Sequence, residues 1–180
     1  MPDASVVITQ TKKWIADVVV GCNFCPFAAK EVKRNSIHYE VLNDAGAEQV
    51  LQALIKECKR LDEQSSIETS FLILPDFFED FTEYLSLAEL SEKLLKQHGY
   101  EGVYQVASFH PAYCFADATE DDAANYTNRS PYPMLHLLRE ESVEAALENF
   151  PDPESIPERN IRFAREKGLA WMKLLREKCF

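Results

Sequence analysis

The sequence predicts a single α/β domain over residues 1–180, with helices flanking a small, mainly parallel sheet. Short apolar runs that suit strands alternate with longer segments in which apolar residues recur at helical spacing. This alternation is typical of strand–helix–strand crossovers. A chain of 180 residues, 46% of them hydrophobic, can bury a core without disulfides or metals. No repeat or low-complexity segment interrupts the chain, so one domain is expected.

The first element is predicted to be a helix over residues 5–20. Its apolar side chains fall on one stripe at helical spacing, and Gly21 is a natural C-terminal stop. A compact loop over residues 22–28 follows the helix. Residues 36–42 then alternate between polar and apolar side chains, which favours a strand.

A second helix follows, capped by Asn43 or Asp44, because both residue types accept hydrogen bonds from the free N–H groups of a first turn. Residues 71–74 form a wholly apolar run, which fits a strand buried on both faces. Asp76, with Glu79 three residues later, has the form of the N-terminal cap of a third helix.

Residues 103–109 alternate and form the third expected strand. The polar segment 110–130 is long for a loop in a compact domain, and loops of that length are usually functional or disordered. A helix is expected over residues 131–147, because prolines are tolerated in a first turn, where N–H groups lack partners anyway. The last helix opens with a capping box formed by Ser155 and Glu158, and Gly168 bends or divides this helix.

Acidic residues outnumber basic ones, 30 to 19, and give a net charge of −11. This acidity argues against nucleic acid as a partner, because the phosphate backbone rewards clustered lysine and arginine. No apolar run approaches the roughly 18 residues of a membrane helix, so no membrane contact is expected. The first residues do not resemble a signal peptide, and the five cysteines are an odd, scattered number. Together these features predict a cytoplasmic protein with reduced thiols.

The acidity is unevenly distributed along the chain. Residues 76–122 carry eleven acidic residues and two lysines, a local net charge of −9. Residues 158–180 carry seven basic and three acidic residues, a net charge of +4. One interpretation is a solvated acidic face docked near a basic terminal helix. The other is an acidic face that binds a basic partner or a cation.

Chemistry is expected where the carboxyl ends of parallel strands meet, because loops and helix N-termini converge there. His110 ends the third expected strand, a position suited to a general base or a metal ligand. The alternative is a histidine that hydrogen-bonds locally and fixes the start of the loop. His38 and His98 lie among polar neighbours and are expected at the surface. We assign no metal ligands and the sequence does not identify a cofactor; metal binding remains a third possibility.

A second candidate is the segment Asn128-Arg129-Ser130. If a helix begins at Pro131, Ser130 caps it and the free N–H groups of its first turn attract an anion. Arg129 adds a planar fork of donors for a carboxylate or phosphate. His136, one turn into that helix, would face the same cleft. Alternatively, Arg129 pins the loop by pairing with one of its acidic residues, which are Asp117, Glu120, Asp121 and Asp122.

Cys25 is the third candidate. With Cys22 it forms a C-x-x-C pair, which is typical of half a zinc site or of a redox pair. No second such pair completes a four-cysteine site, and the pair follows a helix, whereas a thioredoxin-like pair opens one. A Cys25 thiolate with His110 as its base is another option, provided that the fold brings them together. The last option is a buried structural loop.

Three segments, GCNFCPFAAK, QVASFHPAYCF and NYTNRSPYPMLHLLREESV, resemble the bacterial protein family called domain of unknown function 1415. The resemblance covers nearly the whole chain and is most specific at Asn-Arg-Ser-Pro-Tyr-Pro-Met-Leu-His. The family often has an apolar residue where this chain has Cys22, which weakens the redox and C-x-x-C metal options and leaves Cys25 alone. The resemblance implies no activity. The residues that it places in the family's signature segments are Cys25, His110, Asn128, Arg129 and His136.

Two functions are therefore expected. In the first, the Cys25 loop, the strand end at His110 and the segment 128–130 form a cleft that binds a small anionic molecule, with His110 as acid or base. In the second, the protein is a non-catalytic interaction protein that docks a partner on its acidic face.

Overall fold

A computed structural model describes residues 2–180 as an α/β fold built on a four-stranded sheet. The expectation of a mainly parallel sheet is wrong, because a fourth strand lies between two of the expected ones. Only β1 and β2 are parallel neighbours, whereas β4 is antiparallel to both β2 and β3. In the spatial order of the sheet, the strands are β1 (Ile37–Val41), β2 (Thr69–Ile73), β4 (Met134–Arg139) and β3 (Tyr104–Phe109).

The three expected strands nevertheless run in one direction, because β2 and β3 are both antiparallel to β4. Their carboxyl ends, at Val41, Ile73 and Phe109, lie at one border of the sheet. Met134, the first residue of β4, pairs there with both Ile73 and Phe109. We call this border, together with the loops that leave it, the strand-end edge.

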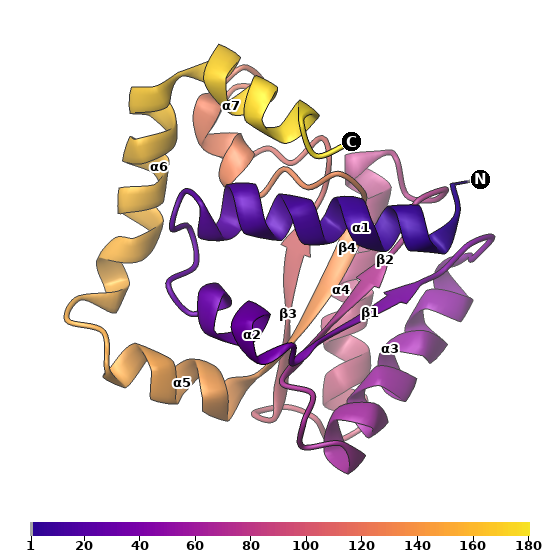
Figure 1. The fold of residues 1–180 in the computed structure, drawn as a ribbon. Helices are drawn as coiled ribbons and strands as arrows, with labels where there is room; N and C mark the ends of the chain where they lie inside the picture. The colour runs from indigo at the N-terminus through magenta and orange to yellow at the C-terminus, as the bar shows by residue number, and fades with distance from the viewer. Residues whose placement is uncertain (1) are drawn as a thin grey trace.

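Helices cover both faces of the sheet (Figure 1). α1 and its π-helical continuation η1 pack on one face, and α3 and α4 pack on the other. Alternate side chains of β2 enter the two halves of the core, Phe71 the first half and Leu72 the second. No helix within residues 2–180 combines the length and apolarity needed to cross a membrane. The helical elements are α1 (Ala4–Trp14), η1 (Ile15–Val20), α2 (Ala28–Arg34), α3 (Ala47–Glu63), α4 (Phe81–Gln97), η2 (Ala123–Thr127), α5 (Glu140–Glu148), η3 (Pro153–Ser155), α6 (Ile156–Lys167) and α7 (Leu169–Glu177).

Two helices begin a few residues later than their expected caps. α3 follows Gly46 rather than Asn43 or Asp44, and α4 follows Asp80 rather than Asp76. In each connection one residue with left-handed backbone, at φ of 55° or 58°, first turns the chain away from the strand. The Asp80 carboxylate then accepts a hydrogen bond, at 2.9 Å, from the N–H of the third residue of α4.

β4 replaces the first part of the helix expected over residues 131–147, and this expectation is wrong. The side chains of Leu135 and Leu137 are fully buried among residues from α3 and α4. A short apolar run that is buried on both faces has no polar side to its pattern, so spacing does not distinguish a strand from a buried helix. The prolines precede the strand, where a missing N–H is tolerated. Helix begins only at Glu140, with α5.

The C-terminal helices pack around η2. Gly168, at φ 85°, divides α6 from α7. The capping box expected at Ser155 does not form, because its hydroxyl donates instead to the carbonyl oxygen of Asp152 at 2.8 Å. Arg165 of α6 pairs with Asp122 at 2.7 Å. The basic terminal segment therefore docks on the end of the acidic segment, as one of the two interpretations of the charge pattern predicts.

Candidate functional site

The long loop after β3 leaves and returns at one point of the strand-end edge. The backbone N–H of His110 donates to the carbonyl oxygen of Asn128 at 3.2 Å, and the Asn128 amide donates to the carbonyl oxygen of Ser108 at 3.3 Å. These bonds bring His110 beside Asn128 and close to the next two residues, Arg129 and Ser130. A role of these four residues in binding or catalysis stays a prediction.

His110 is fully buried, and both of its ring nitrogens have partners in the protein. Nδ1 accepts from the N–H of Ala112 at 3.0 Å, so Nε2 carries the proton and donates to the carbonyl oxygen of Phe78 at 2.8 Å. The rings of Phe81 and Tyr84 lie against it. Burial lowers the pKa of His110, which favours the neutral ring. The arrangement is that of a histidine that fixes the start of the loop, and it leaves no lone pair for a general base.

Arg129 is held by the loop through backbone carbonyl groups rather than carboxylates. Its Nε donates to the carbonyl oxygen of Tyr113 at 2.9 Å, and its Nη2 donates to that of Glu120 at 3.0 Å. Within residues 2–180, none of the four acidic side chains expected as partners pairs with it, and Asp122 pairs elsewhere. Among the described residues, Nη1 of Arg129 donates no hydrogen bond, so the guanidinium keeps donors for a further acceptor.

A second arginine, Arg176 of α7, lies close to Arg129. Its Nε donates to the carbonyl oxygen of Ser130 at 2.9 Å, and its guanidinium lies 5.5 Å from the ring centre of Phe180. Burial lowers the pKa of Arg176; the nearby Tyr126 hydroxyl opposes this shift, and the positive charge of Arg129 adds to it. In the described part of the chain, neither arginine has a carboxylate within 4.0 Å. We call Arg129 and Arg176 the arginine pair.

No helix begins at Ser130, so the expected anion site at a helix N-terminus is wrong. Ser130 is fully buried, its hydroxyl donates to the carbonyl oxygen of Tyr132 at 2.5 Å, and the chain continues into β4. The positive charge at this edge comes instead from Arg129 and Arg176. Arg176 is not among the residues that the sequence singles out; the only indication of it there is the basic composition of the terminal segment.

His136 lies on β4, not on a helix, and faces the first half of the core. Its ring stacks on Phe71 at 3.9 Å between ring centres, and its Nε2 lies 2.7 Å from the hydroxyl of Thr69. That hydroxyl donates its single hydrogen to the carbonyl oxygen of Leu137, so Nε2 of His136 is the donor to Thr69. Burial lowers the pKa of His136 to about 3, yet the residue keeps some accessible surface. The imidazole is therefore neutral and held against the first half of the core.

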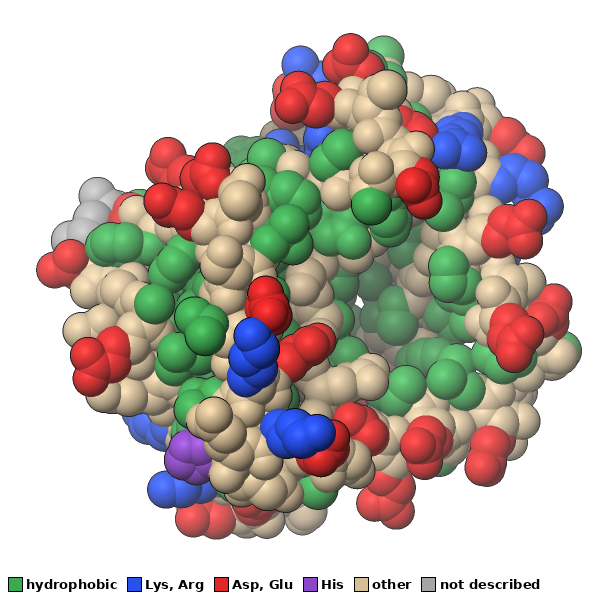
Figure 2. Space-filling model, turned by 180° about the vertical axis from the view of Figure 1, so that it is seen from behind, with side chains coloured by type: hydrophobic (Ala, Val, Ile, Leu, Met, Phe, Trp, Pro, Cys, Tyr) green, Lys and Arg blue, Asp and Glu red, His purple; other side chains and the backbone are tan. Residues whose placement is uncertain are grey.

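A hollow lined mainly with hydrophobic side chains opens on the side where α6 stands away from the sheet (Figures 1 and 2). Acidic side chains stand around it (Figure 2). β3 is the outermost strand on this side, and after the buried Tyr104 all of its residues are half-buried or exposed. The hollow therefore borders a strand with a free outer edge.

Cys25 is half-buried and packs at the margin of the first half of the core. No hydrogen bond joins it to His110 or Arg129 among the described residues, and both nitrogens of His110 are engaged elsewhere. Burial raises the pKa of the neighbouring Cys22 to about 11, which keeps that thiol protonated and unreactive. Within residues 2–180, neither Cys25, His110 nor His136 belongs to a group of three metal-ligating side chains. These observations favour the structural interpretation of the Cys25 loop.

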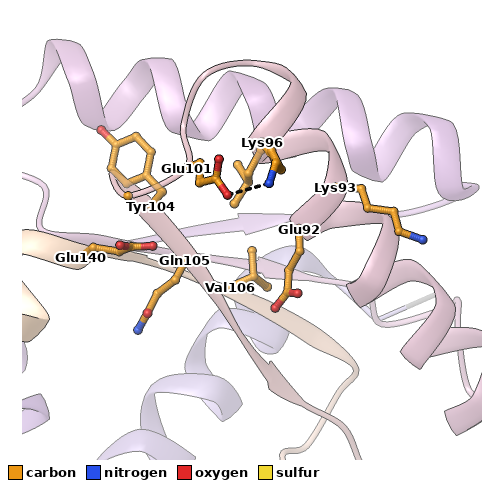
Figure 3. A pocket seen from close by; sticks show the side chains of 10 residues that line it. Glu92, Lys93, Lys96, Glu101, Tyr104, Gln105, Val106 and Glu140 are labelled. Carbon is orange, nitrogen blue, oxygen red and sulfur yellow. Dashed lines mark hydrogen bonds and ion pairs between the residues drawn. The ribbon is translucent and has the colours of Figure 1, made fainter.

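Pockets also lie away from the strand-end edge. One, of about 360 Å³, lies between the end of α4 and β3 and is lined in part by Gln105, Val106 and Glu140 (Figure 3). The ion pair between Lys96 and Glu101, at 2.8 Å, stands at this pocket. Another, of about 550 Å³, lies between α3 and α4. Neither pocket contains a residue that the sequence singles out for binding or catalysis.

A family model described as a protein of unknown function, DUF1415, matches residues 6–173. No curated protein and no solved structure matches the chain. The matched residues include all four strands and the loop of the strand-end edge. From α1 into α7, the chain therefore belongs to the DUF1415 family of proteins of unknown function.

Proposed function

We propose that the protein binds a small anionic molecule at the strand-end edge, through the arginine pair. The observation that carries this proposal is the proximity of two partly buried guanidinium groups that have no carboxylate partner within 4.0 Å in residues 2–180. The chain carries a net charge of −11, so carboxylates are abundant. Two like charges that are partly withdrawn from water are costly unless a negative group compensates them, and a bound anion supplies that group.

The donors available to such an anion follow from the hydrogen bonds already formed. A guanidinium has five N–H groups in a planar fork, which suits the paired oxygens of a carboxylate or phosphate. Arg176 uses only Nε, and Arg129 uses Nε and Nη2. The remaining donors stay on side chains that backbone carbonyls already hold in place, so little conformational entropy is lost when the anion binds.

Binding, rather than catalysis, is the activity that this geometry supports best. The proposed ligand contacts Arg129 and Arg176, while Asn128, Ser130 and His110 hold the loop on which Arg129 stands. The cytoplasm of a bacterial cell is the place where we propose that the protein acts. This is supported by its five free thiols, on Cys22, Cys25, Cys58, Cys114 and Cys179.

The other expected function, docking of a basic partner on an acidic face, has weaker support. Asp122, at the end of the acidic segment, is already paired with Arg165 of the same chain. The acidic side chains around the hollow remain the part of the surface that such a partner would meet (Figure 2).

Thermal unfolding at low salt tests the proposal, with inorganic phosphate, pyrophosphate and succinate as probes. An anion present at a hundred times its dissociation constant stabilises the native state by about 2.7 kcal/mol. For a chain of this size, that gain raises the melting temperature by about 5–10 °C. Arg176→Gln should lose this shift, and Arg176→Lys should keep only part of it, because lysine retains the charge but not the fork.

The matched control is Arg165→Gln, which removes an arginine that already has a carboxylate partner. This variant should keep the full anion-induced shift. Equal shifts in Arg176→Gln and in the wild type, or no shift of the wild type with any of the three anions, would overturn the proposal.

A further inference from the structure

We propose a second site, independent of the arginine pair: His38, Glu40 and Glu57 bind a divalent transition metal such as Zn²⁺. Within residues 2–180, these three side chains form a group whose ligand atoms all lie within 4.8 Å of one another. Imidazole nitrogen and carboxylate oxygen are both zinc ligands in proteins. The site lies on β1 and α3, whereas the arginine pair lies on the η2–β4 loop and α7.

The fold brings these side chains together in a simple way. His38 and Glu40 are two residues apart on β1, so they point to the same face of the sheet. α3 packs on that face and supplies Glu57. His38, expected at the surface, is instead about three-quarters buried, with 26% of its side chain exposed.

The ligand atoms are separated as in long, weak hydrogen bonds, and these separations also match those between the ligands of a tetrahedral metal ion. Nε2 of His38 lies 3.4 Å from Oε2 of Glu40 and 3.6 Å from Oε2 of Glu57. Charge-assisted hydrogen bonds are shorter, about 2.7–2.9 Å. A tetrahedral ion with bonds of about 2.0–2.2 Å separates its ligands by about 3.4 Å, which is close to the separations found here.

Glu57 has the surroundings of an oriented ligand. Its carboxylate is fully buried, and the Ser70 hydroxyl donates to Oε2 at 2.6 Å. Arg60 donates from Nε to Oε1 at 3.0 Å and to Oε2 at 3.2 Å. Hydrogen bonds of this kind fix the direction of carboxylate ligands in metal sites. Glu57 therefore presents Oε2 toward His38 and Glu40 from a rigid position.

The other two ligands are partly exposed, which provides a route of entry. β1 is an outermost strand of the sheet, and His38 and Glu40 keep 26% and 28% of their side-chain surface exposed. Three protein ligands leave one tetrahedral position for water. Such an open position is the arrangement of catalytic rather than structural zinc sites.

The positive charge of Arg60 competes with a metal ion for the carboxylates of Glu40 and Glu57. The guanidinium partly compensates the charge of Glu57 and lies 4.0 Å from Glu40. A positive charge this close weakens the attraction of a cation. Arg60 also fixes the direction of the Glu57 carboxylate, so its loss has two opposing effects on zinc affinity, and variants of the ligands themselves test the site.

Isothermal titration of the full chain with Zn²⁺, after treatment with a chelator, measures the site. We expect one equivalent in the wild type, and at least about tenfold weaker binding in His38→Gln and in Glu40→Gln, since even outer partners of a metal contribute that much. His98→Gln, which changes an exposed histidine, should bind as the wild type does.

The absorption spectrum with Co²⁺ in place of Zn²⁺ distinguishes binding at this site from binding at the cysteines. Thiolate ligands give sulfur-to-metal charge-transfer absorption, whereas nitrogen and oxygen ligands do not. A wild-type equivalent that survives His38→Gln, or that carries thiolate absorption, would overturn the proposal. The arginine variants of the anion site should leave zinc affinity unchanged, so the two proposals fail separately.

Discussion

Tyr84 connects α4 to the strand-end edge, and Tyr84→Phe tests how much that connection contributes to stability. The side chain is fully buried. Its hydroxyl donates to the carbonyl oxygen of Met134 at 2.8 Å and accepts from the N–H of Phe109 at 3.0 Å. One oxygen atom therefore serves the first residue of β4 and the last residue of β3.

Tyr84→Phe removes this oxygen and leaves the shape of the ring unchanged. Two buried backbone groups, the carbonyl of Met134 and the N–H of Phe109, then lack this partner. Each such loss costs about 1–3 kcal/mol. Allowing for relaxation, we expect a loss of about 3 kcal/mol in the free energy of unfolding, or about 6–12 °C in melting temperature for a chain of this size.

Tyr100→Phe is the matched control. The Tyr100 hydroxyl donates to the Asp62 carboxylate at 3.0 Å in an exposed position, so water replaces the lost bond. We expect a loss below about 1 kcal/mol. Urea unfolding followed by circular dichroism gives both values. If the two variants lose equal stability, the reasoning from buried backbone groups at the strand-end edge is refuted.

Three further predictions concern the glycine that follows η1, the histidine of β4 and two leucines of different burial. Gly21→Ala should lose about 1–3 kcal/mol, as measured by urea unfolding, because an added Cβ would lie 2.2 Å from the carbonyl oxygen of Asp17; a gain would contradict this clash. The pKa of His136 is lowered from 6.5 to about 3, so the unfolded state binds more protons between these values. The free energy of unfolding should therefore fall by about 2 kcal/mol between pH 7 and pH 5, and His136→Gln should lose that part of the pH dependence. Leu72→Ala, in the middle of the sheet, should cost about 2–5 kcal/mol, whereas Leu85→Ala, at a position 46% exposed, should cost under about 1 kcal/mol; similar losses would contradict the assigned burial.

The sequence predicts a strand where side chains alternate, or where an apolar run is too short for a helix and is closed by a proline. The strands at residues 37–41, 69–73 and 104–109 lie where alternation or a closed apolar run predicts them. β4 does not, because its leucines enter the second half of the core while Met134 and His136 enter or face the first. A pattern without a polar side carries no period from which to recognise the element.

Only those features of the candidate site that arise between residues close in the sequence can be predicted from it. The position of His110 at the end of a strand follows from alternation and the loop that comes after it. The bond from the His110 ring to Phe78 and the approach of Arg176 to Arg129 join segments far apart in the chain, so they follow from packing alone. One of the two interpretations of Arg129 expects carboxylate partners, but the loop folds so that backbone carbonyl groups bind the guanidinium instead.

The central position of β4 has a consequence for how the chain is made. On the ribosome, β1 and β2 can pair as soon as they emerge. In the described sheet, however, β3 pairs only with β4. The second edge of β2 also pairs with β4, where Thr69 lies opposite Leu138, so this edge stays unpaired until β4 is made. Until residue 139 has left the exit tunnel, β2 and β3 each expose an edge that β4 covers in the folded protein. Such edges recruit other chains, so chaperone dependence and aggregation of a fragment ending before Met134 should exceed those of the full protein.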